Sequence, residues 1–164
     1  MADQLTHVDA SGAARMVDVS AKDVTARTAS ASGFLRTTPA VVALLRGAGL
    51  PKGDALGVAR IAGLMGAKRT PDIVPLCHPI ALHSASVDLE VTDDGVRITA
   101  TTRTADRTGV EMEALTAVAT AGLALFDMIK AVDRGAVLTD IRVDAKAGGR
   151  SGSWARAATS EEAG

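Results

Sequence analysis

The fold is decided by the segment Val87-Asp88-Leu89-Glu90-Val91-Thr92-Asp93-Asp94-Gly95-Val96-Arg97-Ile98-Thr99-Ala100-Thr101. Apolar and polar residues alternate at period two on both sides of an Asp-Asp-Gly turn sequence. The segment therefore predicts two antiparallel strands, over residues 87–91 and 96–101, joined as a hairpin.

A long helix is predicted after the hairpin. Thr108-Gly109-Val110-Glu111 has the form of a capping box, and the helix that it begins is expected to continue until Gly135. Its apolar stripe would consist of Leu115, Val118, Leu125, Ile129 and Val132. Residues 137–143 supply a last strand, and the remainder from Gly148, rich in glycine, serine and alanine, is expected to be a mobile tail.

Two strands and two helices are predicted before the hairpin. Residues 16–20 alternate as a short strand, and residues 25–35 are expected to be extended. Thr38 and Pro39 open a helix through Arg46, which Gly47 and Gly49 close. A second helix begins near Asp54, a good N-cap, and runs to about Arg69 before Pro71 ends it.

Glycines interrupt the second predicted helix. Gly57, Gly63 and Gly66 each cost about 1 kcal/mol of helix propensity relative to alanine. Another segment must therefore approach this helix backbone closely. Tight packing on the sheet and contact with another subunit both remain open.

The segment Lys68 to Pro79 follows that helix with three prolines at four-residue spacing. Pro71, Pro75 and Pro79 fix φ and disfavour helix at the preceding residue, which predicts a rigid extended segment. It holds two cations, Lys68 and Arg69, near a histidine. The segment is either a stiff loop with solvated cations or part of a site.

The order of strand, helices, two strands, helix and strand predicts an α+β fold. It fits a ferredoxin-like layer in which helices pack on one face of an antiparallel sheet. The length of 164 residues suits one domain, so residues 1–164 are expected to form a single domain.

Composition excludes several classes of protein. Basic and acidic residues number 18 and 19, and the net charge of −1 does not indicate attraction to nucleic acid. The N-terminus lacks the apolar run of a secretory signal, and the nearly apolar stretch 114–126 is too short to span a bilayer. One cysteine permits no internal disulfide. We expect a cytoplasmic protein that binds neither nucleic acid nor membrane.

Histidine spacing predicts no metal centre. None of His7, His78 and His83 stands three or four residues from another on a predicted helix. Cys77 and His78 are adjacent in a segment expected to be extended, so they face opposite sides and do not form a nucleophile and base pair on spacing alone. We assign Cys77 a structural role.

Charged residues near helix ends are candidates for chemistry. Asp127 and Lys130 lie three residues apart on one helix face, where they form either a plain ion pair or a lysine held for general acid/base work. Lys52 lies on the loop that enters the second helix. Glu111 and Glu113 point in roughly opposite directions on a helix, so they are not a dyad that shares a proton.

The run Lys146-Ala147-Gly148-Gly149-Arg150 could bring backbone amides and two cations to a phosphate. It lacks the strand-loop-helix pattern of a P-loop, so the signal is weak by itself.

Considered together, these segments resemble the MoaC family, the cyclic pyranopterin monophosphate synthases of molybdenum cofactor biosynthesis. The resemblance runs from Leu5 to about Trp154. It is carried by Leu5-Thr6-His7-Val8-Asp9, Met16-Val17-Asp18-Val19-Ser20, Lys52-Gly53-Asp54, Ala59-Arg60-Ile61-Ala62-Gly63, Ala67-Lys68-Arg69-Thr70, Pro75-Leu76-Cys77-His78-Pro79, Gly109-Val110-Glu111-Met112-Glu113-Ala114-Leu115, Asp127-Met128, Lys130-Ala131-Val132 and Ala145-Lys146.

The resemblance implies an activity and a set of roles. The family converts a 3′,8-cyclised dihydro-GTP, supplied by a radical S-adenosylmethionine GTP cyclase, to cyclic pyranopterin monophosphate with release of pyrophosphate, as a phosphorus-oxygen lyase. The family's catalytic residues fall on Asp127, Lys52 and Lys130. Substrate contacts fall on Leu76, Cys77, His78, Met112 and Glu113, and Arg27, Arg60, Lys68, Arg69, Glu111 and Lys146 are further expected members of the pocket.

The resemblance also implies a homo-oligomer, a hexamer built as a trimer of dimers with sites at the dimer interfaces. No cofactor is required by the sequence, and Mg²⁺ can accompany the triphosphate. Ala147 and Arg150 replace a serine and a lysine that are common in the family. Because arginine does not give up a proton at neutral pH, Arg150 is expected only to contact phosphate.

Helix length supports a shared site independently. Glu111 and Asp127 lie 16 residues apart, so about 24 Å of helix separates them at 1.5 Å per residue. One nucleotide pocket is unlikely to use both ends of the same helix, and a second copy would have to bring its opposite end alongside.

An RNA-binding module and a regulatory domain are the two alternatives to an enzyme. An RNA-binding module of this fold needs stacking aromatics and a basic face, which Phe34, Phe126 and Trp154 do not provide. Composition alone does not separate an enzyme from a regulatory domain that binds a small ligand. The gathering of lysine, aspartate, glutamate and histidine at the motifs above favours the enzyme.

Overall fold

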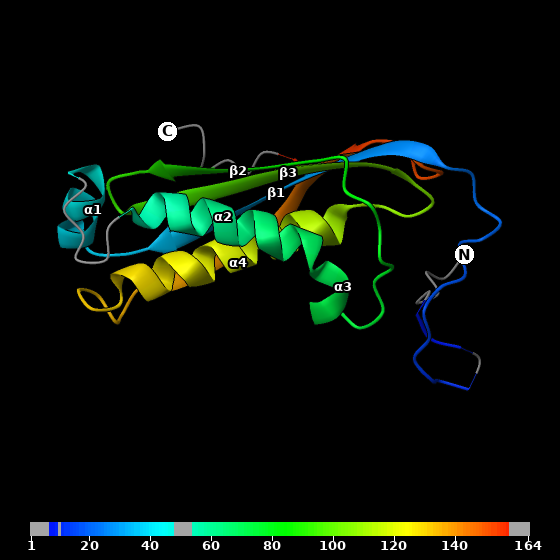
Figure 1. Ribbon diagram of the computed structural model, residues 1–164, viewed down its shortest axis with the longest axis horizontal. Helices are drawn as coiled ribbons and strands as arrows, with labels where there is room; N and C mark the ends of the chain where they lie inside the picture. Colours follow the sequence, from blue (N-terminus) through cyan, green and yellow to red (C-terminus); the bar gives the residue numbers. More distant parts are fainter. Residues whose placement is uncertain (1–6, 10, 48–53, 158–164) are drawn as a thin grey trace.

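The computed structural model describes residues 7–9, 11–47 and 54–157. Its centre is an antiparallel sheet of order β2-β3-β1-β4-β5, with the helices on one face (Figure 1). The strands are β1 Thr25–Arg36, β2 Ser84–Val91, β3 Gly95–Asp106, β4 Val137–Ala147 and β5 Trp154–Ala155. The helices are α1 Pro39–Arg46, α2 Ala55–Lys68, α3 Thr70–Ile73 and α4 Glu111–Ile129. The predicted α+β, ferredoxin-like fold is confirmed.

The hairpin that decides the fold is longer than its sequence pattern. β2 and β3 pair in a register that places Val91 opposite Val96 and continues to Ser84 opposite Arg103. β1 lies between β3 and β4 and pairs with both along most of its length. Its alternate residues divide between two faces, since Leu35 is buried against the helices while Phe34 lies on the other face.

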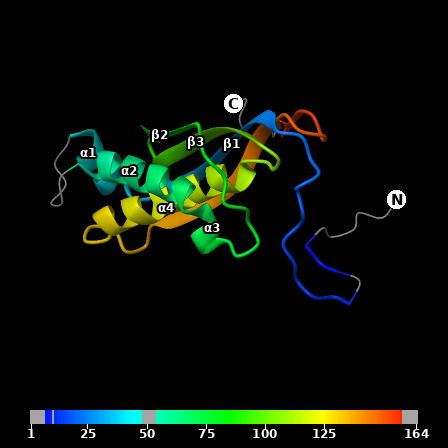
Figure 2. The ribbon, with the colours of Figure 1, turned by 45° about the vertical axis from the view of Figure 1, so that its right-hand side comes forward.

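The core lies between the sheet and α4. Val118, Leu125 and Ile129 of this helix are fully buried, as its apolar stripe predicts. By length and composition α4 would suffice to cross a membrane, but more than half of it is buried inside the fold. It is the central helix of the domain, packed on β1, β3 and β4 and covered by α2 (Figure 2).

The helical glycines are explained by contact within the chain. A Cβ on Gly63 would lie 2.9 Å from the carbonyl oxygen of Ala117 and 3.2 Å from the Cβ of Ala121. A Cβ on Gly66 would collide with Thr120. Both glycines therefore let α2 approach α4, so the close neighbour is mainly another helix of the same chain.

Three predictions before the hairpin need correction or qualification. Residues 16–20 form no strand, because among the described residues no sheet edge lies alongside them to pair with. Pro71 does not continue an extended segment but lies in the first turn of the short helix α3, where its missing N–H costs nothing. Thr38 precedes α1 as predicted, but its side chain makes no capping hydrogen bond. Gly49 lies outside the described residues.

The prediction of a capping box at the start of α4 is wrong. The N-cap is Val110, whose carbonyl oxygen accepts a hydrogen bond from Thr102 Oγ1 of β3 at 2.9 Å. Glu111 is drawn instead to Lys146, 3.4 Å away on β4. The helix also ends at Ile129, before Gly135, which leaves Val132 exposed in the following turn.

The end of the chain contains a strand that the sequence did not predict. Trp154 and Ala155 pair with Lys146 and Ala145 of β4. Part of the segment after Gly148 is therefore hydrogen-bonded to the sheet edge, and its predicted mobility stays a prediction.

Candidate functional site

α2 and α4 run antiparallel, so each end of this helix pair contains the start of one helix and the end of the other (Figures 1 and 2). At one end, α2 finishes, α3 follows and α4 begins. At the other end, α2 begins and α4 finishes. The predicted site residues that the structure describes divide between these two ends, except Arg60, which lies halfway along α2.

Glu113 is the most perturbed acid at the start of α4. Its residue is only 3 % exposed, and burial followed by the charge of Glu111 raises its pKa to about 7. A carboxyl with this pKa can either give or take a proton near neutral pH. Glu111 and Glu113 differ in surroundings, as their spacing predicts, since Glu111 faces Lys146.

The loop after α3 brings Cys77 and His78 to the same end. Burial, followed by the charge of Glu113, raises the pKa of the Cys77 thiol, which places Cys77 near that carboxyl. Nε2 of His78 lies 2.7 Å from the carbonyl oxygen of Val17. Because a carbonyl oxygen only accepts, Nε2 carries the proton, and Nδ1 is left for another partner. Leu76 is half-buried beside them.

A cationic cavity lies beside Glu111. It has a volume of about 90 Å³, and Arg27, Glu111, Lys146 and the backbone at Gly148 line it. Nε of Arg27 donates to the carbonyl oxygen of Asp106 at 2.8 Å, which fixes the guanidinium. Lys146 Nζ lies 2.6 Å from Ser151 Oγ, so this lysine bridges Glu111 and the loop that follows β4.

A second cavity, of about 410 Å³, continues from Arg27 to Arg150 and Lys22. Two consecutive glycines, Gly148 with φ +96° and Gly149 with φ +72°, turn the chain there. A Cβ on Gly148 would meet the carbonyl oxygen of Ala26, so the loop passes directly against β1. The predicted phosphate-contact residue Arg150 thus lines a cavity together with Lys22 and Arg27, and one acid, Asp23, also lines it.

The opposite end of α4 holds the paired Asp127 and Lys130. Lys130 Nζ lies 2.6 Å from Asp127 Oδ1, which confirms the predicted i,i+3 contact, and both side chains are about half exposed. In the next turn, Asp133 Oδ2 accepts a hydrogen bond from Thr37 Oγ1 at 2.7 Å, which links this turn to the end of β1. Lys52 lies outside the described residues.

The remaining predicted residues lie on α2 and at its end. Lys68 and Arg69 are exposed at the end of α2, beside α3, and Met112 is exposed on α4. Arg60 lies halfway along α2, and its Nε donates to the carbonyl oxygen of Val87 at 3.1 Å. Within one chain, Asp127 and Lys130 are therefore not brought together with the group around Glu113.

Sequence reasoning missed Lys22 and Arg107. Lys22 lines the larger cavity, and its carbonyl oxygen accepts from Arg107 Nε at 2.9 Å. Lys22 belongs to none of the motifs that carry the resemblance, so no local signal marked it. For a metal ion, the described residues offer no group of three or more histidine, cysteine, aspartate or glutamate side chains.

Comparison with known proteins shows which family this chain resembles. The MoaC family model matches residues 16–149, which is most of the chain. The chain belongs to the MoaC family. The match covers the predicted catalytic and substrate-binding residues, and Arg150 lies just beyond it.

Several relatives of this MoaC chain are similar over nearly their whole length. A cyclic pyranopterin monophosphate synthase of Streptomyces coelicolor is 68 % identical over 94 % of this chain and 91 % of its own length. One from Nocardioides sp. is 67 % identical over 93 % and 96 %. A protein of Mycobacterium tuberculosis named cyclic pyranopterin monophosphate synthase 2 is 60 % identical over 93 % and 92 %. The predicted family is confirmed, and the roles of single residues stay predictions.

Proposed function

We propose that this chain is a cyclic pyranopterin monophosphate synthase of molybdenum cofactor biosynthesis. It converts 3′,8-cyclised dihydro-GTP to cyclic pyranopterin monophosphate and releases pyrophosphate, which makes it a phosphorus-oxygen lyase. The observation that carries the proposal is the sequence identity of 60–68 % to relatives of this name over almost the full chain.

Phosphate binding falls to the cations at the start of α4. Arg27 and Lys146 line the smaller cavity, and Arg27, Arg150 and Lys22 line the larger one. Arg27 is held by backbone carbonyl oxygens, and an arginine fixed in this way suits the planar, bidentate binding of phosphate oxygens. These cavities would hold the triphosphate, with Lys68 and Arg69 nearby at the end of α2 and Arg60 farther along it.

The cyclic phosphate forms when a sugar hydroxyl attacks the α-phosphorus. The new bond joins the hydroxyl oxygen to that phosphorus, and the bond from the α-phosphorus to the bridging oxygen breaks as pyrophosphate leaves. The hydroxyl proton passes to a base, and cations stabilise the charge of the leaving group. Mg²⁺ bound to the triphosphate could add to that stabilisation.

Ring opening and reclosure need proton donors and acceptors. Lys130, held by Asp127, and Lys52 are assigned these transfers, and Glu113 offers a carboxyl whose pKa of about 7 suits exchange at neutral pH. His78 can use Nδ1, since its Nε2 is occupied by Val17. Leu76, Cys77 and Met112 would shape the pocket around the ring.

The two separated ends of α4 favour a site built by two copies of the chain. The free surface of the helices supports this. Val58, Ile61 and Met65 of α2 are 45 %, 61 % and 49 % exposed, and their spacing of three and four residues puts them on one helix face. Leu123 of α4 is 64 % exposed. A two-fold contact through this apolar surface would set Asp127 and Lys130 of one copy near Glu113 of the other, in a hexamer made of three dimers located in the cytoplasm.

The proposed function is tested by incubating the purified protein with the cyclised GTP substrate. Pyrophosphate release and the appearance of cyclic pyranopterin monophosphate by mass spectrometry, in equal amounts, are expected. Substrate that remains unchanged in the presence of folded protein, with and without Mg²⁺, would refute the proposal.

A further inference from the structure

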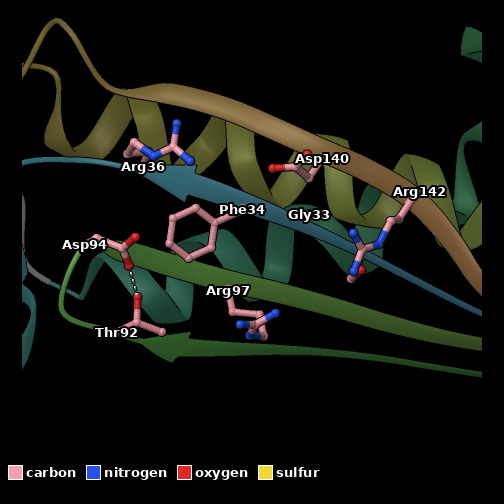
Figure 3. A pocket seen from close by; sticks show the side chains of 9 residues that line it. Gly33, Phe34, Arg36, Thr92, Asp94, Arg97, Asp140 and Arg142 are labelled. Atoms are coloured by element: carbon pink, nitrogen blue, oxygen red, sulfur yellow. Dashed lines mark hydrogen bonds between the residues drawn. The ribbon is translucent and has the colours of Figure 1, made fainter. Parts of the chain in front are cut away.

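The face of the sheet turned away from the helices carries a pocket that the proposed chemistry does not use. Its volume is about 310 Å³, and it lies over β1, β3 and β4 near the hairpin turn. This volume is at the lower end of the range of small-molecule sites. Figure 3 shows three arginines from three strands around the ring of Phe34: Arg36 of β1, Arg97 of β3 and Arg142 of β4.

At least two of these arginines are available to a ligand. Arg36 is exposed at the end of β1 and forms no ion pair with any described residue. The side chain of Arg97 is 47 % exposed, and its nearest acid, Glu90, is 3.8 Å away, beyond hydrogen-bond distance. Arg142 is already engaged, since its Nε lies 3.3 Å from Asp144.

Phe34 is unusual on this face. The chain has only two phenylalanines and no tyrosine, and the neighbouring positions on this side of β1 and β3 are Ser32, Thr99 and Arg97. The ring lies partly over Gly95, whose lack of a side chain makes room for it. The exposed remainder of its surface can stack with a planar group.

Asp140 gives the pocket a second chemical character. It is the only described non-glycine residue with positive φ, at 55°, and it lies in a bulge of β4 opposite Gly33. Glycine is the usual residue at such a bulge position, and another residue there costs about 1 kcal/mol or more. The bulge exposes Asp140 at the pocket beside Arg36, and Asp94 closes the end of the pocket at the hairpin turn (Figure 3).

Carboxylates and arginines together define the ligand. The arginines suit phosphate oxygens, the ring of Phe34 suits a flat heterocycle, and the carboxylates accept hydrogen bonds only from N–H or O–H groups. A bare anion would pair with the arginines but would be repelled by the carboxylates. We propose that this pocket is a second ligand site, for a nucleoside phosphate whose phosphate lies on Arg36 and Arg97 and whose base stacks on Phe34.

Guanosine 5′-monophosphate is the probe, in calorimetric titration of the full chain against inorganic phosphate and guanosine as partial ligands. The nucleotide should bind more tightly than either part. Arg97→Ser or Arg36→Ser should weaken the binding of the nucleotide to this pocket about tenfold or more, because each removes a charge-assisted hydrogen bond. Phe34→Leu should weaken the nucleotide but not inorganic phosphate. Glycine readily adopts the positive φ of residue 140, so Asp140→Gly should not strain the backbone. This variant should reduce the ratio of the affinity for the nucleotide to the affinity for inorganic phosphate.

Two controls separate this site from the substrate site. Arg103→Ser removes the same charge from the same face of β3, six residues from Arg97 and outside the pocket, and should change nothing. Lys146→Ala alters the cationic cavity at the start of α4 and should leave this binding event intact. The absence of nucleotide binding would overturn the proposal, as would loss of binding in Lys146→Ala but not in Arg97→Ser and Arg36→Ser. Binding is measured without turnover, so the result does not depend on the proposed activity.

Discussion

Glu113 has lost most of its contact with water on the inner side of the first turn of α4. Its folded pKa of about 7 is above the ordinary value of 4.5, so the folded protein holds a proton that the unfolded chain releases in that window. The contribution of Glu113 to the free energy of unfolding should therefore be largest below about pH 4.5 and fall by at most about 3 kcal/mol as the pH rises to about 7.

Glu113→Gln should flatten this pH dependence, because the amide does not titrate. Urea unfolding at several pH values between 4.5 and 8 would measure the slope. Glu111→Gln removes the neighbouring charge that helps to raise the pKa of Glu113, so it should reduce the slope without abolishing it. An unchanged slope in Glu113→Gln would show that this carboxyl is ionised in the folded protein throughout the range.

Lys130 and Asp127 predict a second outcome at the scale of residues. Lys130→Ala should fold normally, because the side chain is half exposed, and should lose product formation by at least about a hundredfold if Lys130 carries the proposed proton transfer. Lys52→Ala should behave alike. Lys130→Arg keeps the charge beside Asp127, but an arginine does not give up a proton at neutral pH, so this variant should be inactive as well. Turnover near that of the wild type in either alanine variant would remove that lysine from the mechanism, and unaltered activity in Asp127→Asn would reduce Asp127 to a surface pair.

Cys77 should not act as a nucleophile. Burial and the charge of Glu113 raise the pKa of its thiol, which favours the unreactive protonated form at neutral pH. Cys77→Ser should retain substantial activity in the pyrophosphate assay. A covalent substrate adduct on Cys77, detected by mass spectrometry, would contradict this assignment.

At the scale of elements, the contact between α2 and α4 depends on missing side chains. Gly63→Ala improves helix propensity by about 1 kcal/mol, but its Cβ would press on the backbone oxygen of Ala117. We expect a net loss of about 1–3 kcal/mol in the free energy of unfolding. Gly47→Ala, at the end of α1, is the control, since its nearest atom would be 3.3 Å away. A more stable Gly63→Ala variant would show that the two helices can separate at little cost.

The elements also show where sequence patterns suffice. The hairpin of β2 and β3 was predicted because its signal is local, a turn sequence between two alternating runs. The start of α4 was placed wrongly because Val110 and Glu111 take their partners from β3 and β4, far away in sequence. β5 has two residues and no period of its own, and only the exposed edge of β4 creates it.

In the candidate site too, contacts between residues close in sequence were predictable, and contacts between distant residues were not. Asp127 and Lys130 are three residues apart on one helix, so their contact was predictable. The cavity of Arg27, Glu111 and Lys146 joins three elements, and spacing alone could not assemble it. Family resemblance named these residues, but the buried state of Glu113 required the packed helix.

At the scale of the whole molecule, the shared site predicts complementation. An inactive Glu113 variant mixed with an inactive Asp127 variant should recover part of the activity once subunits exchange, because a mixed dimer contains one intact pair of half-sites. Mass spectrometry of intact assemblies would verify the exchange. Failure to complement after proven exchange, or full activity of a monomer in sedimentation analysis, would rule out the shared site.

The length of α4 sets a ceiling on that recovery. In the proposed dimer, one helix would contribute its first turn to one reaction centre and its last turn to another, so every mixed dimer would have both defects in its second centre. Random pairing makes half of the dimers mixed, and each of those has one working centre out of two. Restored turnover should therefore level off at about a quarter of the wild-type value, however long the exchange continues.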